Sequence, residues 1–198
     1  MKIQHVLRLG VACVALLASG GCLSAIKSPP AGDPVADAAD RRVLAEETIN
    51  QWSNLSAMAA RLTIEQYGIP DEVHGDRLIW HDNGPWRRTV VQNLRPAFIE
   101  GDTVGVVEQT IDYALSPSQA ADVLAFDNHL IYSPQSRELT AVSDNESANF
   151  LRMNLANLVI VGQLQPAQAR DTYAQISSFA ESGKTSPYLL GLHFQPPQ

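Results

Sequence analysis

The chain has 198 residues, a formal net charge of −7 and two cysteines, Cys13 and Cys22. An acidic surface repels nucleic acid and anionic lipid headgroups, so we expect no nucleic-acid partner. Because 45% of the residues are apolar, a chain of this length can bury one core, which predicts a single globular domain.

Residues 1–21 have the pattern of a secretory signal peptide. Lys2 and Arg8 introduce an apolar run, Leu9 to Leu17, that contains no acidic residue. This run of about ten residues is too short for a helix that needs roughly 20 to span a bilayer, so we expect the segment to be removed. Its removal would leave 12 Lys and Arg against 21 Asp and Glu, a formal charge of −9.

Cys22 directly follows Ala18-Ser19-Gly20-Gly21. This arrangement resembles the lipobox of bacterial lipoproteins, although Ser19 stands where that family usually has leucine. The resemblance implies diacylglycerol on the Cys22 sulfur, cleavage before Cys22 and acylation of the new amino terminus, which together would anchor the chain in a membrane. Leu23 in place of aspartate implies, by the same resemblance, the periplasmic face of the outer membrane. The alternative is plain secretion after a cut near Ala25.

The two cysteines also limit the chemistry of the mature chain. Cys13 would leave with the signal peptide, and Cys22 would carry lipid. No thiol would then remain for a disulfide within the chain, a nucleophile, a metal ligand or a haem attachment.

The segment 22–35 contains three prolines and a glycine and is predicted to be a flexible tether, followed by one globular domain over 36–198. A helix is predicted for 36–52, with Val43, Leu44, Ile49 and Trp52 as its apolar set.

Ser53 is the predicted N-cap of a second helix, 54–67, which ends at Gly68 and Pro70. Residues 77–91 are predicted to form a hairpin around Asn83-Gly84. Pro85 lacks an N–H, so we expect a loop wider than two residues.

The second half predicts a strand over 103–115, with Val107, Ile111, Tyr113 and Leu115 on one face. Helices are predicted from Ser116 to Phe126, over 144–161 after a capping box that begins at Ser143, and from Pro166 to Ser182. A hairpin is expected over 129–133 and 138–142, and an edge strand over 188–194. Strands and helices without regular alternation predict an α+β fold with an antiparallel sheet.

The string WHDNGPWRR, 80–88, suggests a partner-binding tip. Trp80 and Trp86 would supply flat contact area, and Arg87 and Arg88 would recognise a carboxylate or phosphate. The alternative places both tryptophans in the core and leaves the arginines in solvent.

Three other patterns were weighed and predict no cofactor, metal or nucleotide. His74 and His81 lie among acidic residues but match no standard zinc spacing, so solvated turns are the better account; the acidic residues are Asp71, Glu72, Asp76 and Asp82. Ser182-Gly183-Lys184-Thr185 ends like a phosphate-binding loop, but Ser178 replaces its first glycine. Asp144 and Glu146 could perform acid–base chemistry, although helix capping explains them.

Residues 54–91 contain a helix that ends in YGIPDEV, followed by a hairpin with NGPW. This order resembles the small helix–hairpin module of BamE-type outer-membrane lipoproteins, which are accessories of the β-barrel assembly machine. The resemblance covers about a fifth of the chain and implies an envelope protein. The same pattern also resembles uncharacterised bacterial lipoproteins, which implies no activity.

Together these patterns predict a lipid-anchored, non-catalytic envelope protein that binds another protein or an envelope component. The alternative is a periplasmic hydrolase that acts on an envelope polymer and uses serine, histidine and carboxylate residues distant in the sequence. A histidine such as His81 or His129 beside a carboxylate in a deep polar cleft would favour the hydrolase. A soluble-ligand binding protein would need an apolar cavity.

Overall fold

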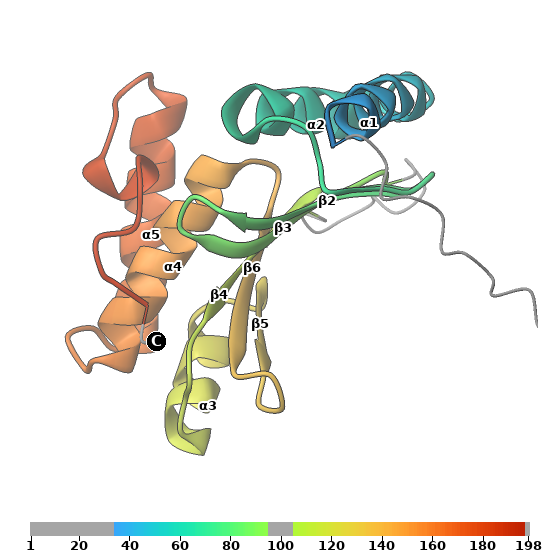
Figure 1. Cartoon of the computed structure of the whole chain (residues 1–198). Helices are drawn as coiled ribbons and strands as arrows, with labels where there is room; N and C mark the ends of the chain where they lie inside the picture. The colour runs from blue at the N-terminus through green and yellow to red at the C-terminus, as the bar shows by residue number, and fades with distance from the viewer. Residues whose placement is uncertain (1–33, 95–104, 197–198) are drawn as a thin grey trace, which may run out of the picture. The chain divides into compact units, whose positions relative to one another are not determined.

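The computed structural model describes residues 34–94 and 105–196, with the side chains of 34–36 left aside (Figure 1). The predicted signal peptide, Cys22 and nearly all of the predicted tether lie outside these residues. The described residues form one compact unit, and its helices and antiparallel sheet confirm the predicted α+β class. None of the described helices is long and apolar enough to cross a bilayer.

The described strands form one antiparallel sheet in the order β1-β2-β3-β4-β6-β5. The strands are β1 (Glu72–Val73), β2 (Arg77–Asn83), β3 (Trp86–Gln92), β4 (Val107–Asp112), β5 (Leu130–Ser133) and β6 (Glu138–Ser143). Only the β4–β6 neighbours are not consecutive in the chain, because helix α3 (Pro117–Phe126) and β5 intervene.

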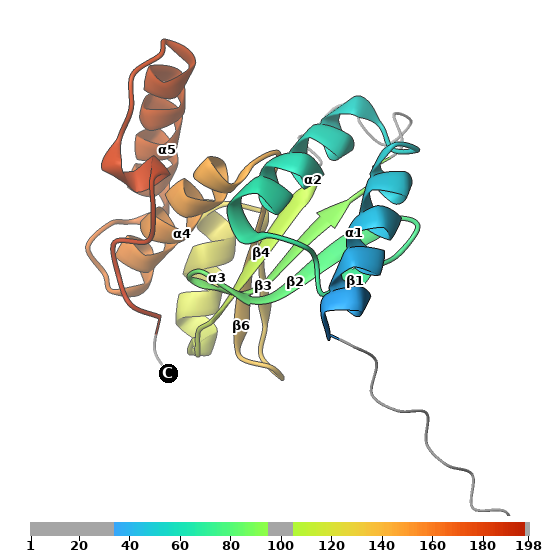
Figure 2. The ribbon, with the colours of Figure 1, turned by 45° about the horizontal axis from the view of Figure 1, so that its top comes forward.

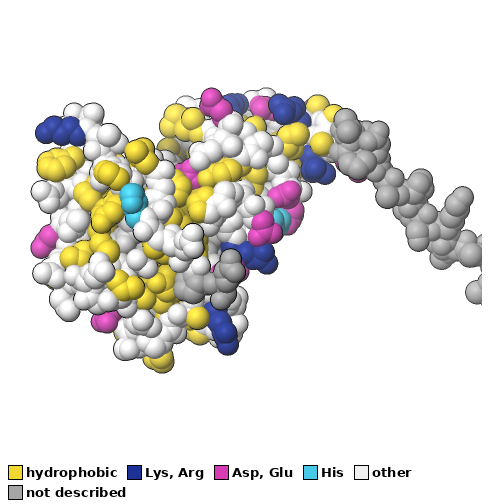
Figure 3. Space-filling model, turned by 60° about the vertical axis from the view of Figure 1, so that its left-hand side comes forward, with side chains coloured by type: hydrophobic (Ala, Val, Ile, Leu, Met, Phe, Trp, Pro, Cys, Tyr) yellow, Lys and Arg dark blue, Asp and Glu magenta, His cyan; other side chains and the backbone are white. Residues whose placement is uncertain are grey.

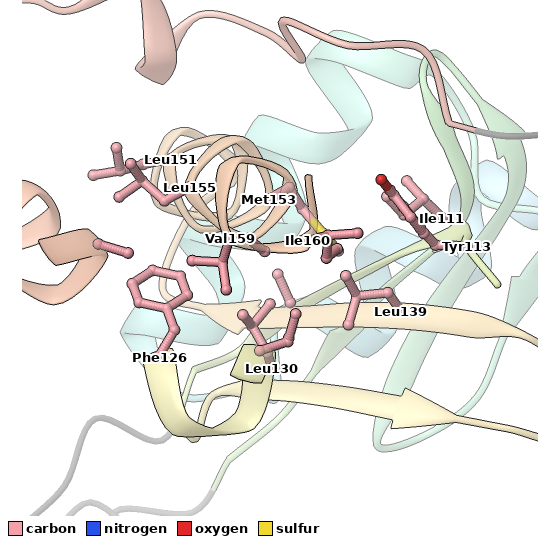
Figure 4. Close-up of a cluster of buried hydrophobic side chains, with 14 of the residues drawn as sticks. Ile111, Tyr113, Phe126, Leu130, Leu139, Leu151, Met153, Leu155, Val159 and Ile160 are labelled. Atoms are coloured by element: carbon pink, nitrogen blue, oxygen red, sulfur yellow. The ribbon is translucent and has the colours of Figure 1, made fainter. Parts of the chain in front are cut away.

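Two hydrophobic clusters pack against the same face of this sheet. The first cluster, with residues of α1 (Pro34–Ile49) and α2 (Asn54–Tyr67), includes Val107. The second, with residues of α3, α4 (Glu146–Ile160) and α5 (Pro166–Glu181), includes Ile111. Val107 and Ile111 are four residues apart on β4, so their side chains point to the same face of the sheet. Helices α1 and α2 cover the β1–β2 end (Figure 2). Helices α3, α4 and α5 form the second cluster, in which the side chains of α4 meet those of α3, β5 and β6 (Figure 4).

Several predicted helix ends are confirmed by the atoms that cap them. The Ser53 side chain accepts a hydrogen bond from the N–H of Ser56, and Gly68 ends α2 with a φ of 82°. Ser116 and Gln119 form the predicted capping box of α3. The first helix begins at Pro34, two residues before the predicted start, since proline suits the first helical position.

The hairpin turn is tighter than predicted. Asn83 pairs with Trp86, so the loop has only two residues, Gly84 and Pro85. Gly84 adopts a φ of 61° at the first central position, and Pro85 takes the second, where a turn needs no N–H donor. The expected wider loop was therefore wrong because the turn is centred one residue later than Asn83-Gly84.

The predicted edge strand over 188–194 is also wrong. Pro187–Leu189 forms a short 3₁₀ helix, η2, and the residues after it follow α4 without pairing to a described strand. The Asn154 amide donates to the carbonyls of Tyr188 and Gly191 and accepts from the N–H of His193. This one buried side chain satisfies backbone groups that a strand partner would otherwise satisfy.

Gly105 provides a test of how closely β4 and β6 approach. A Cβ atom at this position would overlap the backbone of Ser143, whereas one at Gly75 would meet no atom within 4 Å. We expect Gly105→Ala to lower the free energy of unfolding by about 3 kcal/mol and Gly75→Ala to change it by less than about 0.5 kcal/mol. Urea denaturation of both variants checks this, and equal losses would contradict the close approach.

Candidate functional site

Helix α4 begins later than predicted, and this places the Glu146 side chain in a candidate binding site. The N-cap is Asn145, whose side chain accepts from the N–H of Ala148, and not Ser143. Ser143 instead ends β6, where its hydroxyl accepts from Arg152. The predicted capping-box role of Glu146 is therefore wrong, and its carboxylate points toward other elements.

Three donors from three elements converge on one oxygen of Glu146. The Tyr67 hydroxyl, at the end of α2, and the Trp86 indole N–H, at the start of β3, each lie 2.5 Å from Oε1. The Gln109 amide of β4 lies 2.8 Å from the same oxygen. Within the described residues no donor reaches Oε2. All three donors are neutral, so Glu146 acts as a partly buried acceptor without a bound cation.

Tyr67 is held in the donor role by its surroundings. Burial raises the pKa of its phenol well above the usual value, and the hydrogen bond to Glu146 and the charge of that carboxylate raise it further. The tight hairpin turn lies directly beneath the ring, since a Cβ atom on Gly84 would be 3.0 Å from Tyr67 Cε1. The turn therefore helps to fix the phenol against the carboxylate.

A second set of buried side chains orients Gln109. Its Oε1 accepts from the amide of Asn149 at 3.0 Å, and that amide also donates to the carbonyl of Val107. Asn83 donates to the hydroxyl of Thr89, which in turn lies 3.5 Å from Gln109 Nε2. These contacts point the Gln109 N–H group at Glu146 and leave it little freedom to rotate.

A groove of about 580 Å³ runs along α2 and ends at this carboxylate. Its apolar wall comes from Leu55, Met58 and Leu62, which are three and four residues apart and share one side of α2. Met58 and Leu62 are 57% and 54% exposed, so this wall is open to solvent. The described lining also includes Glu65, Gln66, Tyr67, Val107, Gln109, Asp144 and Glu146.

The predicted binding-tip residues occupy different environments. Trp80 and Trp86 are only 2% and 1% exposed, and the Trp80 indole donates to the carbonyl of Gly68. Arg87 pairs with Asp82 at 2.6 Å, and Arg88 reaches Glu138 at 3.5 Å. Both tryptophans therefore lie in the core, as the alternative interpretation of residues 80–88 expects. Partner binding by residues 80–88 stays a prediction. The buried indoles of Trp80 and Trp86 expose almost no surface that a partner could contact.

The acidic and histidine-rich region around β1 forms an exposed hydrogen-bonded cluster. Glu72 accepts from His74 at 3.0 Å and from His81 at 2.8 Å, and these contacts lower the pKa of Glu72, with the His81 hydrogen bond as the largest cause. In the part of the chain that the structure describes, no group of three or more His, Cys, Asp or Glu residues could hold a metal ion.

A second hollow of about 530 Å³ lies around the loop between α3 and β5. Asp127 accepts from the backbone N–H and the Nδ1 of His129 through one oxygen, and from Arg152 at 2.7 Å through the other. The Arg152 guanidinium also lies over the Tyr173 ring. The described residues that line this hollow include no Ser, Thr or Cys. The Asp127–Arg152 ion pair connects this loop to α4.

The sequence Ser182-Gly183-Lys184-Thr185, which resembles the end of a phosphate-binding loop, follows the last turn of α5 and begins no α-helix. The Gly183 N–H bonds back to Ala180, and the Lys184 ammonium lies 5.3 Å from the centre of the Phe179 ring. This position matches a helix C-terminus with glycine in the left-handed region, where φ is 79°.

Sequence reasoning missed the roles of Tyr67, Gln109 and Glu146. The helical pattern of 54–67 does not indicate a distant partner for Tyr67, Gln109 lies between Val107 and Ile111 on the predicted apolar face of its strand, and helix capping accounts for Glu146. A buried polar residue in an apolar alternation, such as Gln109, is the one sequence pattern that could have indicated the network.

No protein-family model, curated protein or solved structure matches the chain. These comparisons therefore neither support nor contradict the resemblance of residues 54–91 to the BamE-type module.

The Glu146 network makes a prediction about stability. Glu146→Ala would leave the Trp86 and Gln109 donors without an acceptor and should lower the free energy of unfolding by about 3 kcal/mol or more. Glu146→Gln keeps an acceptor oxygen and should cost less than half of that amount. Urea denaturation measures both, with the exposed Glu181→Ala as control, and equal costs for the two Glu146 variants would contradict the network.

Asp127 makes a prediction about pH. Burial favours the protonated acid, but the N–H of His129 and the charge of Arg152 outweigh it and hold the pKa of Asp127 below its usual value. The carboxylate therefore stabilises the fold above the unfolded pKa of about 3.9, and this stability is lost as the pH falls through the folded pKa.

We expect Asp127→Asn to cost about 3 kcal/mol at neutral pH because it leaves the buried Arg152 without its carboxylate. The difference from the native chain should shrink as the pH falls below about 4. Urea denaturation across this pH range is the measurement, and the exposed Asp171→Asn is the control. A difference that stays constant with pH would contradict the ion pair.

Proposed function

We propose that this protein is a lipid-anchored envelope protein that binds a partner through the groove between α2 and the start of α4. The observation that carries the proposal is the groove itself. It combines a row of exposed apolar side chains on α2 with a fixed, partly buried carboxylate. A recess of this composition and size is typical of a binding site.

The energetics favour a partner over empty solvent. Met58 and Leu62 are each more than half exposed, and full burial of such a side chain contributes about 1.5–3 kcal/mol. Covering both would supply several kcal/mol from apolar contact alone. The polar network beneath them provides a rigid floor, because α2, β3, β4 and α4 meet at one oxygen.

The proposed anchor explains how a modest contact could be effective. Lipid on Cys22 would hold the domain at the membrane, and a tether of about 14 residues would average roughly 20 Å as a flexible coil. A partner on the same membrane surface would then experience a high local concentration of the groove. The lipobox resemblance and Leu23 support the periplasmic face of the outer membrane as the location.

One face of the molecule carries many exposed hydrophobic side chains. Figure 3 shows one face of the molecule, on which hydrophobic side chains gather while most Lys and Arg side chains lie toward the edges. Contiguous exposed apolar surface is typical of interaction sites.

A photo-cross-linker at position 62 tests this function. We expect benzoylphenylalanine in place of Leu62, in native membranes, to give discrete protein adducts. The same probe in place of Leu124, which is 50% exposed on α3, should give none of them. Cys22→Ser should reduce the yield at position 62 strongly, because the domain leaves the membrane surface.

Two outcomes would contradict the proposal. Adducts at position 124 but not at 62 would mean that the groove is not the binding site. Absence of adducts at both positions would mean that the protein does not hold a partner through this side of the domain.

A further inference from the structure

The charge of the groove is one-sided. Three carboxylates line it, Glu65, Asp144 and Glu146, and none of its described lining residues is Lys, Arg or His. None of these carboxylates takes part in an ion pair within the described chain. The groove therefore attracts a positively charged group, and the attraction adds to the apolar contact.

Glu146 also limits the shape of that group. Its Oε1 already accepts three hydrogen bonds, whereas Oε2 accepts none within the described chain. An arginine fork needs both oxygens of a carboxylate for its two parallel bonds. A lysine ammonium is a compact charge that needs one. The single open oxygen therefore favours lysine.

The apolar row limits the occupant further. Leu55 and Leu62 are seven residues apart on α2, so the row that they form with Met58 is about 10 Å long at 1.5 Å per residue. The exposed fractions of Met58 and Leu62 show that the row is open on its outer side. A small ligand would be covered on one side only, while binding pockets cover 70–90% of such ligands. A protein segment brings its own backbone and neighbouring side chains to cover the row.

We propose, resting on the function above, that the groove binds a segment of a partner protein that carries a lysine beside apolar side chains. The apolar side chains lie on Leu55, Met58 and Leu62, and the lysine ammonium donates to Oε2 of Glu146. An amphipathic helix presents such a pattern, with apolar residues three and four apart and lysine at one end of the stripe.

Three synthetic 12-residue helical peptides test this with the purified domain, residues 22–198 with Cys22→Ser. One has a leucine stripe and one lysine, the second has norleucine in place of lysine, and the third has glutamate there. Fluorescence polarisation of the labelled peptides should show the order lysine, norleucine, glutamate, with about ten- to hundredfold between the first and second. Amide chemical shifts should map binding to α2 and the start of α4.

Variants of groove residues distinguish the contribution of the Glu146 charge from that of the apolar contact. Glu146→Gln keeps the acceptor for Tyr67, Trp86 and Gln109 but removes the charge, so it should abolish the difference between the lysine and norleucine peptides. Met58→Ser should weaken both of these peptides alike. Leu124→Ser, at an equally exposed apolar position outside the groove, should change neither. Thermal unfolding confirms that each variant is folded.

The possible failures are distinguishable. Equal binding of the lysine and norleucine peptides, or no effect of Glu146→Gln, would overturn the lysine assignment and leave the groove as the binding site. No binding of the lysine peptide at millimolar concentration would also overturn it, while adducts at position 62 in membranes would still support the proposed function. Displacement of the peptide by octylammonium at a lower concentration than by unlabelled peptide would assign the groove to a free amine instead.

Discussion

The position of α2 relative to α4 and the centre of the sheet depends on one carboxylate oxygen. Glu146 Oε1 accepts hydrogen bonds from α2, β3 and β4 while the residue itself begins α4, so a single atom fixes the relative positions of four elements. Hydrogen bonds to an ionised acceptor are stronger than those between neutral groups, and each is specific in direction. Hydrophobic contact alone would not specify the angle between α2 and α4, because it has no direction.

This constraint matters because the sheet has two cores on one face. The α1–α2 cluster and the α3–α4–α5 cluster meet along a row of buried polar side chains that includes Gln109, Asn149 and Thr89. Two apolar clusters could otherwise merge or slide along the sheet. The amide N–H groups of Gln109 and Asn149 in this row are hydrogen-bonded, which favours one relative position over others because any displacement would leave buried donors without acceptors. The groove lies along this boundary, where α2 and α4 are held apart.

The sequence predicted those features that neighbouring residues determine. Ser53, Gly68 and Ser116 cap their helices through atoms three or four residues away, and the β5–β6 hairpin joins adjacent segments. The errors arose where distant residues compete. Glu146 makes its contacts with residues 37 to 79 positions away, which outweighs a local capping box. Residues 188–194 have the apolar composition of a strand, but Asn154 satisfies their backbone and holds them against α4. For Trp86 the sequence left both a core and a binding position open, because the acceptor of its N–H lies 60 residues later, a relation that the hairpin sequence does not contain.

The same network that builds the fold determines what the groove can recognise. Because three neutral donors fill Oε1, Glu146 remains an acceptor, and the elevated pKa of Tyr67 keeps the phenol protonated as one of those donors. Oε1 therefore stabilises the fold, and Oε2 is the oxygen that can accept a hydrogen bond from a bound partner. A partly buried negative charge without an opposite charge in the described chain gains more from a cation than an exposed carboxylate would, because water screens it less. Apolar contact along α2 then contributes affinity, and the carboxylate contributes selectivity for a positive group. The residues that separate the two cores thus also define the chemistry at the end of the groove.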